Sequence, residues 1–110
     1  MSGGIAAERL ISTDLLTEQL VPDEGSAGLG TASRALGAFA ASELGLWEAG
    51  PGQDDDAESD ELFLVLAGAG TLEFEDGSTI QLRPGVLVRL RAGDRTTWHL
   101  AQRLRKLYLA

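Results

Sequence analysis

The sequence predicts an all-β fold, a single-domain antiparallel β-barrel preceded by an N-terminal arm. A chain of 110 residues has the length of about one domain. Its composition is that of a globular protein with many turns, since 44% of the residues are hydrophobic and 14 are glycine. Short apolar runs separated by glycine and proline turns are typical of a sandwich or barrel. Together these features predict one β-domain and no second domain.

The first 25 residues are expected to form an arm, and residues 26–110 the barrel domain. The arm carries a weak helical spacing of apolar residues. It leads into a segment, residues 21–30, that is rich in Pro, Gly and Ser and is typical of a loop. We expect the arm to pack on the barrel or on a second subunit.

Regular strand and turn signals begin after Gly30. The apolar runs that predict strands are Ala35–Ala41, Leu44–Glu48, Glu61–Ala67, Gly70–Glu75, Ser78–Arg83, Val86–Arg91 and Thr97–Leu100. The strongest local signal is Asp76-Gly77, which predicts a tight hairpin between two of these runs. Alternation then assigns the inner face of that hairpin to Leu72, Phe74, Ile80 and Leu82.

The run over residues 61–67 is apolar on both faces. Phe63 and Val65 lie on one face, and the other face carries Leu62, Leu64 and Leu66. A strand that is apolar on both faces needs cover on both faces. In so small a barrel a second subunit is the expected cover, so the sequence predicts a homodimer.

Charge and cysteine content limit the partners and the compartment. A net charge of −8 argues against nucleic acid and against anionic membranes as partners. The absence of cysteine leaves no disulfide framework, and the N-terminus lacks the pattern of a secretory signal, so a cytoplasmic protein is expected. The acidic run at residues 54–61 is interpreted first as a solvated loop.

The chain from Gly45 to Tyr108 resembles a branch of the cupins that includes ureidoglycine aminohydrolase and the ethanolamine-utilisation cupins. The residues that carry the resemblance are Gly45-Leu46-Trp47-Glu48, Pro51-Gly52, Asp60-Glu61, Gly68, Asp76-Gly77, Pro84-Gly85, Ala92-Gly93, Thr97-Trp98 and Arg105-Lys106-Leu107-Tyr108. The resemblance implies a jelly-roll barrel. It implies no single activity, because cupins carry many chemistries on one fold.

The resemblance also implies where a metal ion would be held. In metal-binding cupins the ion is held by two histidines and a glutamate of the first motif and by one histidine of the second motif. Glu61 and Gly68 keep the spacing of the glutamate and the turn glycine. Asp54 and Asp56 stand at the two histidine positions of the first motif, and Thr96 at that of the second. With a gap one residue shorter, the first two positions hold Asp55 and Ala57 instead.

Two interpretations of these positions stay open. In the first interpretation, Asp54, Asp56 and Glu61 form an oxygen-only site for a hard cation such as Mg²⁺, Mn²⁺ or Ca²⁺. Ni²⁺ and Zn²⁺ are further ions to test. In the second and preferred one the site is degenerate, no cofactor is used, and Glu61 is a lone acid that faces the barrel. Such a carboxylate is a candidate catalytic group for proton transfer.

A metal-free barrel can still hold a small molecule, and the ligand-binding residues we expect are Trp47, Phe63, Val65 and Trp98. Arg89 and Arg91 are expected to point outward, because Val88 and Leu90 are the more natural inward residues. His99, the only histidine, is expected at the surface.

The sequence therefore favours a small-molecule-binding cupin that acts as a sensor, carrier or accessory protein. One alternative is a metal-dependent or acid/base enzyme, a hydrolase or isomerase of a small polar metabolite, with Glu61 as ligand or general base. The other is a structural protein that uses its apolar outer faces for assembly.

Overall fold

The computed structural model describes residues 4–24 and 28–110, and it confirms the all-β prediction. The elements are α1 (Ile5–Arg9), β1 (Val21–Pro22), β2 (Ala32–Phe39), β3 (Ser42–Ala49), β4 (Gly52–Ala57), β5 (Glu61–Ala67), β6 (Gly70–Phe74), β7 (Thr79–Leu82), β8 (Leu87–Leu90), β9 (Arg95–Leu100) and β10 (Leu104–Leu109). None of the helices in the described part of the chain is long and apolar enough to cross a membrane.

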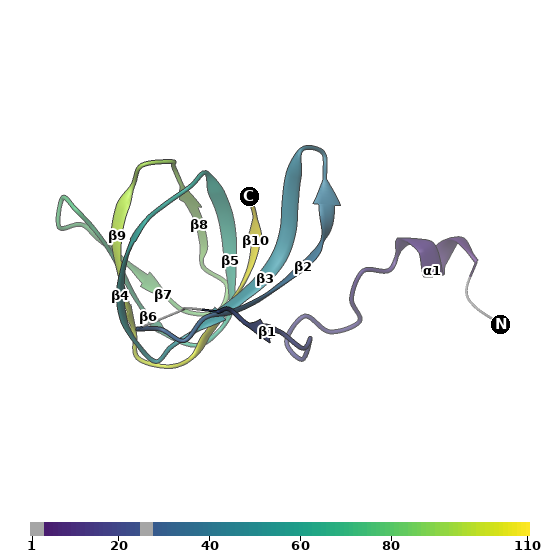
Figure 1. Ribbon diagram of the computed structural model, residues 1–110, viewed down its shortest axis with the longest axis horizontal. Helices are drawn as coiled ribbons and strands as arrows, with labels where there is room; N and C mark the ends of the chain where they lie inside the picture. Colours follow the sequence, from purple (N-terminus) through teal and green to yellow (C-terminus); the bar gives the residue numbers. More distant parts are fainter. Residues whose placement is uncertain (1–3, 25–27) are drawn as a thin grey trace.

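The strands form two antiparallel sheets that curve around a common interior (Figure 1). One sheet has the order β1-β2-β3-β10-β5-β8, and the other has the order β4-β9-β6-β7. The inward residues of both sheets form a core that includes Phe63, Val65, Leu72, Leu90 and Leu104, each at most 1% exposed. Burial of these side chains supplies the main driving force for the fold.

The predicted hairpin is confirmed between β6 and β7. Leu72 pairs with Ile80, and Gly70 with Leu82, so the inner and outer faces fall as the alternation predicts. Gly77 sits in the turn with a φ of 86°, a conformation that glycine adopts without a steric penalty. Val88 and Leu90 also face the core as predicted, and Arg89 reaches outward to Asp60.

Part of the acidic run is not a loop, so that prediction was wrong. Residues 52–57 form β4, which pairs with β9 in the order Asp54 with Trp98, Asp55 with Thr97 and Asp56 with Thr96. Aspartate has a low preference for strands, which hid this element in the sequence. β4 lies at the edge of its sheet, where charged side chains stay hydrated and protect the open edge from further pairing.

The N-terminal segment extends away from the barrel, and α1 has no buried residue (Figure 1). Residues 1–3 and 25 of the predicted arm lie outside the described residues, and the domain boundary at residue 25 stays a prediction. The segment is attached to the outside of the barrel where the Arg105 Nη1 atom donates a hydrogen bond to the Leu15 carbonyl oxygen at 2.7 Å.

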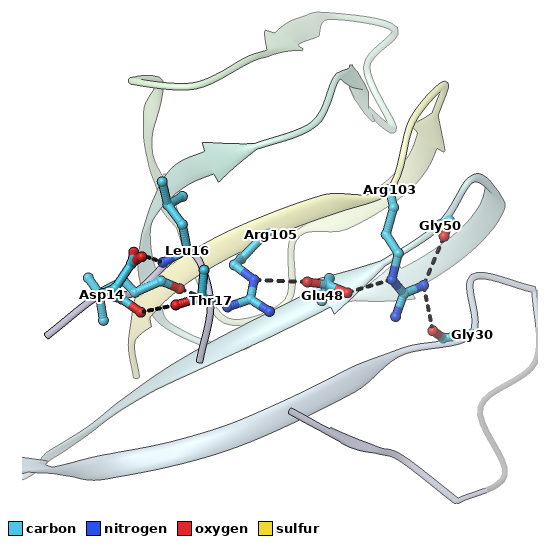
Figure 2. A network of polar contacts seen from close by, with 9 residues as sticks. Asp14, Leu16, Thr17, Gly30, Glu48, Gly50, Arg103 and Arg105 are labelled. Atoms are coloured by element: carbon cyan, nitrogen blue, oxygen red, sulfur yellow. Dashed lines mark hydrogen bonds and ion pairs between the residues drawn. The ribbon is translucent and has the colours of Figure 1, made fainter. Parts of the chain in front are cut away.

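A network of two arginines and one glutamate fixes this attachment (Figure 2). The Glu48 carboxylate accepts hydrogen bonds from Arg103 Nε at 2.6 Å and from Arg105 Nε at 2.8 Å. Arg103 also donates to the carbonyl oxygens of Gly30 and Gly50. Burial acts to raise the pKa of Glu48, but the two guanidinium groups outweigh it and hold the pKa below its usual value.

The outer face of the larger sheet carries a stripe of leucines. Leu64 of β5 pairs with Leu87 of β8 and Leu107 of β10, and Leu62 pairs with Leu109. Leu62 is 40% exposed and Leu87 is 63% exposed. This stripe is the surface that the predicted homodimer would cover.

Leu62→Asp is therefore expected to yield a monomer, because a carboxylate buried in an apolar interface would lose its hydration. Light scattering coupled to gel filtration measures the mass directly. Thr79→Asp, an exposed change on the other sheet, is the control and should leave the mass unchanged. A Leu62→Asp protein with the same mass as a dimeric wild type would contradict the assignment of the interface.

Candidate functional site

The two sheets enclose a cavity of about 350 Å³ that is open to solvent at one side. Its walls come from β2, β3, β5 and β10 of one sheet and from β4 and β9 of the other. The lining residues are Leu29, Thr31, Ser33, Trp47, Asp54, Asp55, Asp56, Glu58, Glu61, Trp98, Lys106 and Tyr108. The cavity thus combines aromatic walls with several carboxylates and one amine.

The amine belongs to Lys106, the only lysine in the chain. Alternation along β10 turns Leu104, Lys106 and Tyr108 inward and leaves Arg105 outside. The Lys106 Nζ atom lies 2.5 Å from Glu61 Oε2, and the two side chains are 6% and 16% exposed. This is a nearly buried ion pair, whose members need every available partner to offset the loss of water.

Three aromatic rings supply further partners for Lys106. The Nζ atom lies 4.6 Å from the ring centroid of Trp47, 4.5 Å from that of Phe63 and 4.9 Å from that of Trp98. The faces of aromatic rings attract cations, and Trp is the strongest of them. The rings also contact one another, since the centroids of Trp47 and Trp98 are 5.3 Å apart. Lys106 therefore sits in an aromatic cage built from β3, β5 and β9.

Glu58 supports the cage from the loop after β4. It is buried, at 9% exposure, and its Oε2 atom accepts hydrogen bonds from Thr96 Oγ1 at 2.6 Å and from Trp98 Nε1 at 3.0 Å. The two bonds fix the indole of Trp98 against Lys106.

Tyr108 closes the β3 side of the cavity. Its hydroxyl group donates a hydrogen bond to Glu43 Oε2 at 2.6 Å, and burial together with this carboxylate raises the pKa of Tyr108 well above its usual value. The ring lies over Gly45, where a Cβ atom would overlap it. The glycine of the Gly45-Leu46-Trp47-Glu48 motif is thus required by the tyrosine on the neighbouring strand.

Asp54 and Asp56 lie on the inner face of β4, opposite Trp98 and Thr96. Burial, and then the negative charge of Glu58, raise the pKa of Asp56 above its usual value. The cavity therefore carries more negative charge than its single lysine compensates.

The residues at the metal positions do not fit a cupin metal. No group of three His, Cys, Asp or Glu side chains in residues 4–24 and 28–110 is arranged to hold an ion. Glu61, the carboxylate of the motif, already pairs with the Lys106 ammonium group, and the Thr96 hydroxyl group donates to Glu58. A cation beside Glu61 would meet the positive charge of Lys106 at close range. Asp54, Asp56 and Glu61 share the cavity but not an ion site.

Among the predicted ligand-binding residues, Trp47 and Trp98 line the cavity, and Phe63 contacts Lys106 from the core. Val65 belongs to the core and does not reach the cavity wall. His99 lies on the outer face of β9, where its Nε2 atom is 2.9 Å from Glu73 Oε1.

Sequence reasoning missed Lys106 and Glu58. The sequence did contain a signal for Lys106. Alternation in Leu104–Leu109 puts Leu107 and Leu109 on one face of the strand and Lys106 and Tyr108 on the other. The only lysine of the chain is therefore on the same face as Tyr108, which is the inner face. Nothing in the sequence distinguished Glu58 from the other acidic residues of the run at residues 54–61.

Comparisons with known proteins agree with this fold. Residues 36–108 match the family model described as the EutQ-like cupin domain. No curated protein matches the chain.

Several solved structures are similar to the chain. The EutQ protein of Clostridium difficile has a TM-score of 0.70 and 18% identity, over 89% of this chain and 83% of that one. A DUF861-family protein of unknown function from Pseudomonas syringae pv. tomato has a TM-score of 0.71 and 22% identity, over 87% and 45%. The polyketide cyclase RemF of Streptomyces resistomycificus has a TM-score of 0.68 and 20% identity, over 92% and 78%. At such identities the likeness concerns the fold.

Asp56→Asn is expected to stabilise the protein at pH 7. An acid whose pKa is raised by folding costs stability at a pH above its ordinary value of 3.8, and this cost disappears below that pH. Because Asp56 is largely exposed and solvent screens its charge, the gain should be about 0.5 kcal/mol. Thermal unfolding at pH 7 and pH 3 measures it, with the exposed Glu75→Gln change as control. A gain of equal size at both pH values would contradict this origin.

Proposed function

Because this chain belongs to the EutQ-like cupin family, we propose that it is a cupin that binds a small molecule without a metal ion, as a sensor, carrier or accessory protein. The observation that carries the proposal is the cavity of about 350 Å³, lined by Trp47, Trp98 and Tyr108 and provided with its own cation, Lys106. Concave sites with aromatic walls and a few fixed polar groups are typical of ligand pockets.

The polar groups favour a small polar ligand. Carboxylates of β4 line the cavity together with Ser33 and Tyr108. These two hydroxyl groups donate to Asp23 and Glu43, and their oxygens can still accept hydrogen bonds from a ligand. Trp47, which is only partly buried, offers apolar ring surface for a short carbon skeleton, and Trp98 packs behind it at 3% exposure. A metabolite that combines hydroxyl or amino groups with a small skeleton matches this arrangement.

An acid/base enzyme is the second candidate, and one observation favours it. Two nearly buried carboxylates, Glu58 and Glu61, line the same cavity as the Lys106 amine. Such groups can exchange protons with a bound substrate. The finer resemblance to ureidoglycine aminohydrolase belongs to this candidate. Its chemistry would rest on these side chains and not on a metal ion, because the residues at the metal positions do not fit one.

A purely structural role is the least favoured candidate. That role predicts a barrel filled by side chains, and the cavity of this barrel is not filled. The leucine stripe remains available for a homodimer, which is compatible with ligand binding.

Tryptophan fluorescence is expected to report ligand binding directly. The chain has two tryptophans, Trp47 and Trp98, and both line the cavity. A screen of small polar metabolites should find a compound that changes the emission saturably at one molecule per chain. Ser33→Phe, which fills the cavity from β2 without adding a tryptophan, should abolish the response, whereas the exposed Gln81→Ala change on β7 should not affect it.

The same screen separates the candidates. A bound compound that is recovered chemically unchanged supports a sensor or carrier, and a compound that is converted, with loss of conversion in Glu61→Gln, supports the enzyme. A protein whose emission responds to no compound, while Ser33→Phe is as stable as the wild type, would contradict ligand binding.

A further inference from the structure

One side chain supplies all the positive charge on the described walls of the cavity. Among the lining residues, Lys106 is the only lysine or arginine, and the carboxylates are Asp54, Asp55, Asp56, Glu58 and Glu61. The eight arginines of the chain lie elsewhere. The cavity thus contains one cation among five carboxylates, whose negative charges it partly compensates.

The surroundings of the Nζ atom suit a cation and would not suit a neutral group. On one side is the Glu61 carboxylate at 2.5 Å, and on three others are ring faces within 4.9 Å. A carboxylate and ring faces both attract positive charge, and neither gains much from an uncharged amine. Trp47 and Phe63 belong to one sheet and Trp98 to the other, so both sheets enclose the Nζ atom.

We infer that the ammonium group of Lys106 is a resident cation that takes the place of the metal ion in this barrel and excludes a divalent ion from Glu61. Glu61 is the residue that the motif spacing aligns with the metal carboxylate, and its Oε2 atom binds Nζ instead. To bind a divalent ion, Glu61 would have to release Lys106, which would lose its ion pair and its contacts with the rings. This inference holds whether or not the cavity takes a small molecule.

The inference predicts a latent cation site. Without the lysine side chain, Glu61 faces an empty space bounded by Trp47, Phe63 and Trp98 and has no compensating charge. Lys106→Ala, which keeps the Cβ atom, should therefore bind n-propylammonium, which restores the three missing carbons and the charge.

The test measures thermal unfolding of wild type and Lys106→Ala with n-propylammonium and with 1-propanol, and of the wild type with Mn²⁺. At ten times its Kd the ammonium ion should raise the Tm of the variant by roughly 5–10 °C. 1-Propanol, which has the three carbons but no charge, should give no comparable rise. The wild type should respond to neither cation at Glu61, and Arg91→Ala, an exposed cation removed outside the cavity, should behave as the wild type does.

If Lys106→Ala does not fold, Lys106→Met and the double variant Lys106→Met/Glu61→Gln test the inference instead. Lys106→Met keeps the volume but leaves Glu61 unpaired, so adding Glu61→Gln to it should raise the Tm. Three results would overturn the inference: Mn²⁺ binding to the wild type that is lost in Glu61→Gln, an equal response of Lys106→Ala to 1-propanol, or a double variant no more stable than Lys106→Met.

Discussion

The interior of this barrel is organised by the requirement that one nearly buried ammonium group be compensated on every side. Glu61 neutralises Lys106, and three rings cover the directions that the carboxylate leaves open. Other polar contacts follow from this arrangement: Glu58 holds the Trp98 ring in place, and Thr96, at a metal-ligand position of the motif, holds Glu58. A charge so placed is costly if any partner is lost.

The register of two strands connects this interior to the outer surface. In the pairing of β3 with β10, Trp47 lies opposite Lys106 on the inside. The adjacent pair, Glu48 and Arg105, lies on the outside (Figure 2). A slip of one residue would exchange the two faces and put Lys106 in solvent. The ion pairs of Glu48 with Arg103 and Arg105 therefore stabilise the register on which the aromatic cage depends, while Arg105 also anchors the N-terminal segment through Leu15.

Local patterns in the sequence predicted the fold because turns and strand faces are determined by residues that are close together in the chain. Asp76-Gly77 determines a turn, and the alternation in Leu72–Leu82 determines which face is buried. β4 escaped prediction because its aspartates are tolerated only at a sheet edge, a property of the assembled sheet. Glu61, Trp47 and Trp98, which were predicted as site residues, line the cavity. Lys106, the partner of Glu61, was missed, since a lysine becomes an interior residue only when a carboxylate and three rings from other strands converge on it.

The most direct test of the central claim uses the fact that the chain has a single lysine. Protein labelled with ¹³C only in lysine gives one Cε–Hε signal, and ring currents from Trp47, Phe63 and Trp98 should move its proton shift upfield of that of a free lysine. The signal should stay sharp when Mn²⁺ is added, because the ammonium group keeps the paramagnetic ion away from Glu61. A shift equal to that of free lysine, or a signal broadened by stoichiometric Mn²⁺, would contradict the account.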